Sequence, residues 1–110
     1  MTPATASNQF YGTGRRKTSS ARVFLRPGKG QIVINHRLFK DAAATEMLRL
    51  VIRQPLVVTE SAERFDVLAT TTGGGVSGQA GALRLGIARA LLQYNADLKS
   101  TLRKAGLLTR

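Results

Sequence analysis

The chain has 110 residues, of which 43% are hydrophobic, and 17 lysines and arginines against 6 acidic residues give it a formal net charge of +11. One domain with its own core is expected. The absence of cysteine excludes a disulfide scaffold and a thiolate metal site, and the single histidine leaves little material for a His-rich metal site or Ser-His catalysis; we expect no cofactor. No apolar run could span a membrane and residues 1–9 lack the features of a secretory signal or transit peptide, which favours a cytoplasmic protein.

The first third of the chain predicts strands. Residues 20–26 alternate between two faces, which carry Ala21, Val23 and Leu25 against Arg22, Phe24 and Arg26. Residues 27–30 are typical of a turn, and alternation resumes over residues 31–35, so we expect a hairpin over residues 18–35. A further strand over residues 9–11 should be broken by Gly12 and Gly14.

Helices dominate the rest of the sequence. A helix is expected to begin at the cap Asp41 and to end at Gln54, before Pro55. After a strand over residues 65–71, residues 77–94 predict a helix with two apolar faces, which must both be covered. A last helix should begin at the cap Asp97 and stop at Gly106. We therefore expect a two-layer α+β fold, in which helices pack on a hairpin and a further strand.

The positive charge is concentrated at the two ends of the sequence. Residues 1–40 carry eight positive charges and no negative one, residues 41–80 have a net charge of −2, and residues 81–110 return to +5. Clustered charge of one sign builds a local potential that attracts a polyanion. With a sequence pI near 11.6, this pattern favours nucleic acid as the partner.

Residues 73–78 have the spacing of a glycine-rich dinucleotide motif after a strand and before a helix. The chain has no room for the second parallel strand and ribose-binding acid that such a fold needs, and it lacks the lysine of a phosphate loop. A tight strand-to-helix corner and a phosphate contact at the helix start remain two equally plausible interpretations. The same residues could form a tight corner and also contact a phosphate.

Two further segments suggest phosphate contacts. Arg15, Arg16 and Lys17 lie between glycines and hydroxyl side chains, as in an irregular phosphate track, although a solvated charge run is the alternative. Arg103 and Lys104 lie at a helix C-terminus, where cations are stabilised by the helix dipole in any case. The acidic residues 60, 63 and 66 have no evident catalytic partner, and His36 is a lone imidazole, so we do not expect an enzyme.

Several motifs resemble a known family. They are Gly12-Thr13-Gly14-Arg15-Arg16-Lys17, Pro27-Gly28-Lys29-Gly30, Val51-Ile52-Arg53-Gln54-Pro55, Gly73-Gly74-Gly75-Val76-Ser77-Gly78-Gln79-Ala80-Gly81 and Leu102-Arg103-Lys104-Ala105-Gly106. In this order, they closely resemble the bacterial form of the ninth protein of the small ribosomal subunit. Most members continue past the equivalent of Arg110 into a basic tail that reaches the peptidyl-site transfer RNA, so contact with that RNA is not carried over to this sequence.

The resemblance implies a fold like that of the second domain of the fifth small-subunit ribosomal protein, with a mostly antiparallel sheet and a left-handed βαβ unit. It implies a flexible N-terminus over residues 1–8 and a single RNA-binding domain over residues 9–110. The partners it implies are small-subunit ribosomal RNA in the subunit head and neighbouring ribosomal proteins, with no membrane and no small-molecule substrate. The competing class is a nucleotide-binding enzyme fragment, of the type of the small-metabolite kinases, that uses the glycine-rich helix start.

The sequence and the resemblance together give a set of candidate RNA-binding residues. They are Arg15, Arg16, Lys17, Arg22, Lys29, Gly74, Gly75, Ser77, Gln79, Arg84, Arg89, Arg103, Lys104 and Arg110.

Overall fold

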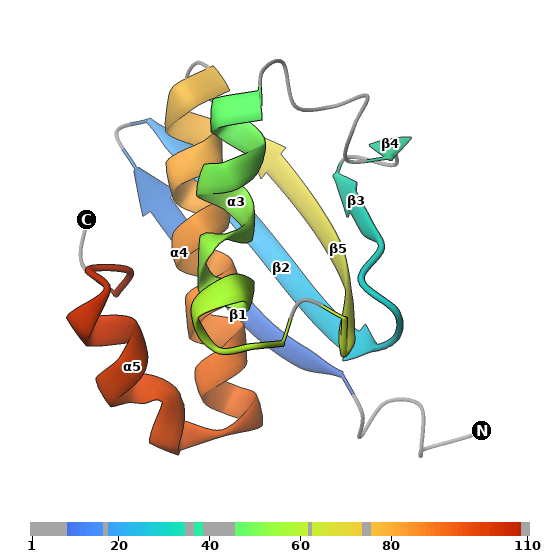
Figure 1. Ribbon diagram of the computed structural model, residues 1–110. Coiled ribbons are helices and arrows are strands. Elements are labelled where there is room, and N and C mark those ends of the chain that lie inside the picture. The colour runs from blue at the N-terminus through green and yellow to red at the C-terminus, as the bar shows by residue number, and fades with distance from the viewer. Residues whose placement is uncertain are drawn as a thin grey trace.

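The computed structural model describes residues 9–16, 18–34, 37–38, 46–61, 63–73 and 76–108. Its strands are β1 (Phe10–Arg16), β2 (Ser19–Pro27), β3 (Ile32–Ile34), β4 (Arg37–Leu38) and β5 (Phe65–Thr72). Its helices are α3 (Glu46–Val58), α4 (Val76–Tyr94), the 3-10 turn η1 (Ala96–Leu98) and α5 (Lys99–Lys104). The sheet forms one layer, and α3 and α4 pack side by side on one of its faces (Figure 1). The predicted α+β class is confirmed.

The sheet is mixed, with the strand order β1-β2-β5-β3-β4. The pairs β1–β2, β2–β5 and β3–β4 are antiparallel, whereas β3 and β5 are parallel. The predicted hairpin over residues 18–35 is therefore wrong, because β2 pairs with β1 and β5 and not with β3. Alternation of side chains indicates which face of a strand is buried, and it carries no information about the neighbouring strand.

The turn after β2 directs β3 away from β2. One carboxylate oxygen of Asp66, on β5, accepts hydrogen bonds from the backbone N–H groups of Lys29, Gly30 and Gln31, at 3.1, 3.2 and 3.0 Å. The N–H of Gly28 also donates to the carbonyl oxygen of Arg64. These bonds hold the turn against the start of β5. The chain therefore crosses the end of β5, and β3 pairs with the edge of β5 that faces away from β2.

Replacing Asp66 by alanine is expected to lower the free energy of unfolding by about 2 kcal/mol, because three backbone donors lose a charged acceptor. Urea unfolding followed by circular dichroism measures this change. Glu63→Ala removes an exposed acid three residues away and should change the stability by less than about 0.5 kcal/mol. Equal stability of the two variants would contradict the role of Asp66.

Gly12 and Gly14 lie inside β1, and the predicted break at these residues is wrong. A Cβ atom at Gly12 would lie 2.3 Å from the carbonyl oxygen of Gly86 on α4, and one at Gly14 would lie 2.0 Å from that of Ala82. The two glycines therefore let the backbone of a strand touch the backbone of a helix. Gly12 and Gly14 thus allow β1 to pack closely on α4. They do not interrupt the strand, which continues to Arg16.

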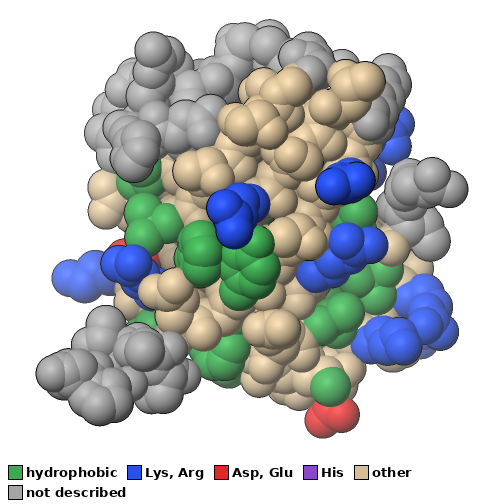
Figure 2. All heavy atoms as spheres, turned by 180° about the vertical axis from the view of Figure 1, so that it is seen from behind, with side chains coloured by type: hydrophobic (Ala, Val, Ile, Leu, Met, Phe, Trp, Pro, Cys, Tyr) green, Lys and Arg blue, Asp and Glu red, His purple; other side chains and the backbone are tan. Residues whose placement is uncertain are grey.

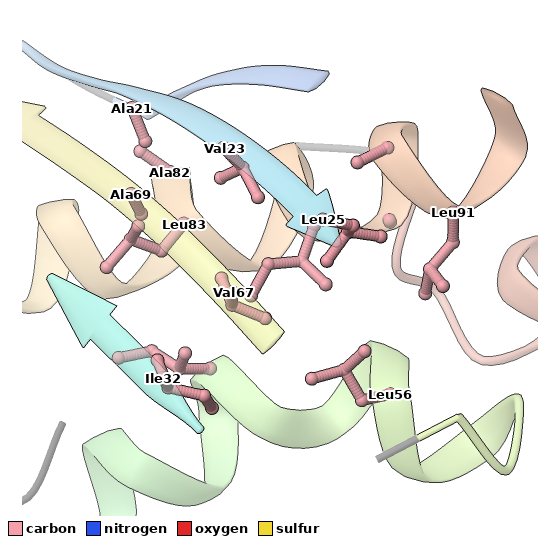
Figure 3. Packing of buried hydrophobic residues seen from close by; sticks show 14 of the residues in the cluster. Ala21, Val23, Leu25, Ile32, Leu56, Val67, Ala69, Ala82, Leu83 and Leu91 are labelled. Atoms are coloured by element: carbon pink, nitrogen blue, oxygen red, sulfur yellow. The ribbon is translucent and has the colours of Figure 1, made fainter. Parts of the chain in front are cut away.

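The core lies between the sheet and the helices, as Figure 3 shows for side chains of β2, β5 and α4. The strand predicted over residues 65–71 and its inward residues are confirmed: Phe65, Val67 and Ala69 are buried. The helix predicted over residues 77–94 is confirmed too. Its two apolar faces are covered, one of them by β1 and β2 and the other by α3 and the rest of the core.

Helix α3 does not end at Gln54 as predicted, because it runs through Pro55 to Val58. Proline removes one helix hydrogen bond, but Pro55 and Leu56 are fully buried, and this burial offsets the loss. The hydroxyl of Thr59 then donates to the carbonyl oxygen of Pro55 at 2.8 Å, which satisfies a terminal acceptor. The predicted cap Asp41 lies outside the described residues.

The C-terminal helix α5 begins at Lys99, later than predicted, and its N-cap Leu98 makes no side-chain cap hydrogen bond. The predicted cap Asp97 lies in the preceding turn η1, which is capped by Asn95: the side-chain oxygen of Asn95 accepts the N–H of Asp97 at 3.0 Å. The turn η1 leads into α5, which ends before Gly106 as predicted. Gly106 has φ +76°, and the N–H of Leu107 donates to the carbonyl oxygen of Leu102, which is a Schellman motif.

Candidate nucleic-acid interface

The face of the sheet opposite α3 and α4 is covered by no described helix, and we call it the open face (Figures 1 and 2). Strand pairing arranges its side chains in rows that cross the sheet. The rows are Arg15–Ser20–Thr72, then Thr13–Arg22–Thr70, then Tyr11–Phe24–Leu68–Val33, and finally Arg26–Asp66. An apolar row therefore lies between two rows that contain an arginine.

Two arginines of the open face are held by neighbouring side chains. The Nε of Arg22 donates to the hydroxyl of Tyr11 at 3.2 Å, and the Nε of Arg26 donates to Oε1 of Gln9 at 3.1 Å. The hydrogen bond to Tyr11, followed by its electrostatic effect, raises the pKa of Arg22 above its ordinary value. Arg22 thus remains a cation at any pH at which the protein is studied.

Other candidate residues lie on the helical side. The side chain of Arg16 packs over Gly81, where a Cβ would lie 2.3 Å from its Cδ. Arg84 is half-buried, and its Nη1 donates to Oε1 of Gln54 on α3 at 3.5 Å. Arg103 and Lys104 are exposed on α5. The candidate cations therefore occupy both layers of the fold.

Arg89 has a structural partner that sequence patterns did not predict. Its Nη1 donates to the carbonyl oxygen of Thr13 at 3.0 Å, and one turn later Oε1 of Gln93 accepts the N–H of Tyr11 at 3.4 Å. β1 lies at the edge of the described sheet, so no described strand pairs with its outer backbone groups. Two side chains of α4 satisfy two of these groups.

The glycine corner between β5 and α4 is tied to the sheet. Gln79 donates from Nε2 to the carbonyl oxygen of Gly73 at 3.1 Å, and the hydroxyl of the buried Ser19 donates to the same oxygen at 3.0 Å. Gly73 has φ +76°, which glycine adopts without strain. These contacts support the interpretation as a tight corner. Gly74 and Gly75 lie outside the described residues; Ser77 lies in the first turn of α4, and its side chain is not described.

The candidate residues therefore do not gather on one face. Arg15 and Arg22 share the open face, whereas Lys29 is exposed in the turn after β2. Lys17 and Arg110 lie outside the described residues. The alternation of residues 20–26 correctly predicted that Phe24 and Arg26 share a face with Arg22, but neither was counted among the candidate RNA-binding residues. Tyr11 was missed, because its place on the open face depends on the β1–β2 pairing.

The described residues contain no group of three or more His, Cys, Asp or Glu side chains that could hold a metal ion. Within the same residues, no helix is both long and apolar enough to cross a membrane.

A family model described as ribosomal protein S9/S16 matches residues 14–110. The match includes the basic end of β1, the glycine corner and α5.

Proposed function

The chain belongs to the ribosomal protein S9/S16 family, and from this premise we propose that it binds ribosomal RNA in the head of the small subunit through cations on both layers of its fold. Membership implies a structural, non-enzymatic role in the small ribosomal subunit, with ribosomal RNA and other ribosomal proteins as partners. The nucleotide-binding enzyme considered from residues 73–78 does not agree with this family and is set aside.

The observation that carries the proposal is the placement of the exposed cations. Arg15 and Arg22 lie on the open face, while Arg103 and Lys104 lie on the opposite layer. In Figure 2, Lys and Arg side chains are spread over the open face among uncharged ones, and acidic side chains are scarce in this view. A protein with exposed cations on both layers of its fold can contact several RNA segments at once, because phosphate contacts depend mainly on charge.

The remaining candidates belong to the same proposal. Lys17 follows β1 directly and would extend the Arg15–Arg16 contacts, and Lys29 would reach RNA beyond the other end of β2. Gly74, Gly75 and Ser77, at the start of α4, would bring backbone N–H groups close to a phosphate. We propose residues 9–110 as one RNA-binding domain.

We also propose the fold of the second domain of the fifth small-subunit ribosomal protein, with a left-handed β3–α3–β5 unit. Figure 1 supports this handedness: with the helices in front, β3 and β5 both run upward and β5 lies to the left of β3. A right-handed crossover, which is the common form, would place β5 on the right.

Salt dependence tests the RNA contacts. Replacing Arg15, Arg16 and Lys17 by glutamine should flatten the slope of log K against log salt by ~2 to 3 units, since each lost phosphate contact removes about 0.7 to 0.9. The affinity for a small-subunit RNA fragment is measured over a range of salt concentrations. A matched control replaces Arg53, Arg64 and Lys99, three exposed cations outside the candidate set, by glutamine. An equal change of slope in both variants would contradict the assignment.

A further inference from the structure

The apolar row of the open face contains a pair of aromatic rings, which contacts with RNA phosphates do not explain. Tyr11 and Phe24 form a ring pair with centroids 4.8 Å apart and an interplanar angle of 42°. Both rings are half-buried, so part of each side chain stays accessible. Next to them, Phe24, Val33, Leu68, Ala69 and Thr70 line a shallow hollow of about 170 Å³. This row would suit a flat, partly apolar ligand.

The charge around the row favours a polyanion. Arg22 lies in the adjacent row on one side and Arg26 in the adjacent row on the other, and rows two residues apart along a strand are separated by about 7 Å. Asp66 is the only acidic residue in the four rows, and one of its oxygens is occupied by three backbone N–H groups. The two arginines beside the row therefore favour a negatively charged ligand.

From the proposed RNA-binding function, we infer that the open face binds an unpaired RNA strand, with its bases stacked on Tyr11 and Phe24 and its phosphates near Arg22 and Arg26. A base can stack on an aromatic ring only when it is free of its own helix, so the site selects single-stranded segments. The hydrogen bond from Arg22 to Tyr11 keeps the guanidinium beside the ring, which places a phosphate contact within reach of a stacked base.

The double variant Tyr11→Leu/Phe24→Leu tests this inference, because leucine keeps the row apolar and removes both rings. We expect fluorescein-labelled octauridylate to bind about tenfold more weakly, with an unchanged salt slope. Binding of an RNA duplex of similar length should not change. Fluorescence anisotropy measures both affinities. Leu50→Ala is the control, since it truncates a side chain that is 69% exposed on α3, and it should leave both affinities unchanged.

Two results would overturn the inference. One is an unchanged affinity of the double variant for octauridylate, as expected if a protein packs on this face. The other is an equal loss of affinity for octauridylate and for the duplex. The glutamine variant at positions 15–17 keeps the two proposals apart: if its salt slope falls while the aromatic variant binds normally, only the stacking inference fails.

A second measurement keeps both aromatic rings in place. The chain has two tyrosines and no tryptophan, so Tyr94→Phe leaves Tyr11 as the only tyrosine. Phenylalanine retains the ring that packs edge-on against Phe10 and Phe65. Octauridylate should quench the emission of Tyr11 in a saturable manner. Emission that stays constant while anisotropy reports bound RNA would exclude stacking on this ring.

Discussion

Replacing Gly14 by alanine is expected to lower the free energy of unfolding by about 3 kcal/mol or more, a large part of the stability of a domain of this size. The added Cβ would lie 2.0 Å from the carbonyl oxygen of Ala82 and 2.6 Å from the backbone nitrogen of Gly86. Both atoms belong to the backbone of α4, which cannot rotate away as a side chain can. β1 would have to separate from α4 and lose its packing on the core.

Urea unfolding followed by circular dichroism measures this effect. Thr13→Ala changes the neighbouring, exposed residue of β1 and should alter the stability by less than about 0.5 kcal/mol. Gly106→Ala adds a methyl group where no atom lies within 4 Å, but at φ +76°, and should cost about 1 kcal/mol from backbone strain alone. If Gly14→Ala is no more harmful than these two variants, β1 does not pack on α4 as described.

Replacing Leu102 by alanine is expected to cost about 2 to 5 kcal/mol, because it leaves a cavity where a fully buried side chain joins α5 to the core. Leu102 lies beside the Schellman motif, and Leu107, on the other side of the turn, is also buried. Among the described residues of α5 and of the turn that follows it, only these two leucines are buried, so they attach this segment to the core. Arg103 and Lys104 follow Leu102 directly, so their position depends on this anchor.

Thermal and urea unfolding measure the loss, and Thr101→Ala, an exposed neighbour, is the matched control. Proteolysis adds a local measurement, since a detached α5 should be cleaved after Arg103 or Lys104 by trypsin while the rest of the chain stays protected. A stability equal to that of Thr101→Ala, with no faster cleavage, would show that α5 is not held by Leu102.

Local patterns in the sequence were sufficient for the main elements. The alternation of Ala21, Val23 and Leu25 identified the buried face of β2, and the two apolar faces over residues 77–94 identified a helix covered on both sides. The family also followed from the sequence, because its motifs are short and contiguous. Each of these features is expressed within a single segment, through the period of a strand or a helix or through an uninterrupted motif.

Only the tertiary structure decided which segments are neighbours. In the structure, β3 pairs in parallel with β5 and does not form a hairpin with β2. Gly12 and Gly14, which were expected to break a strand, are contact points with α4. Tyr11 and Phe24 are neighbours on the open face. Every residue except proline offers the same backbone N–H and carbonyl groups, so sequence patterns do not tell which strands will pair. That choice depends on how all buried faces fit together at once, and it placed the described candidate cations on both layers of the fold.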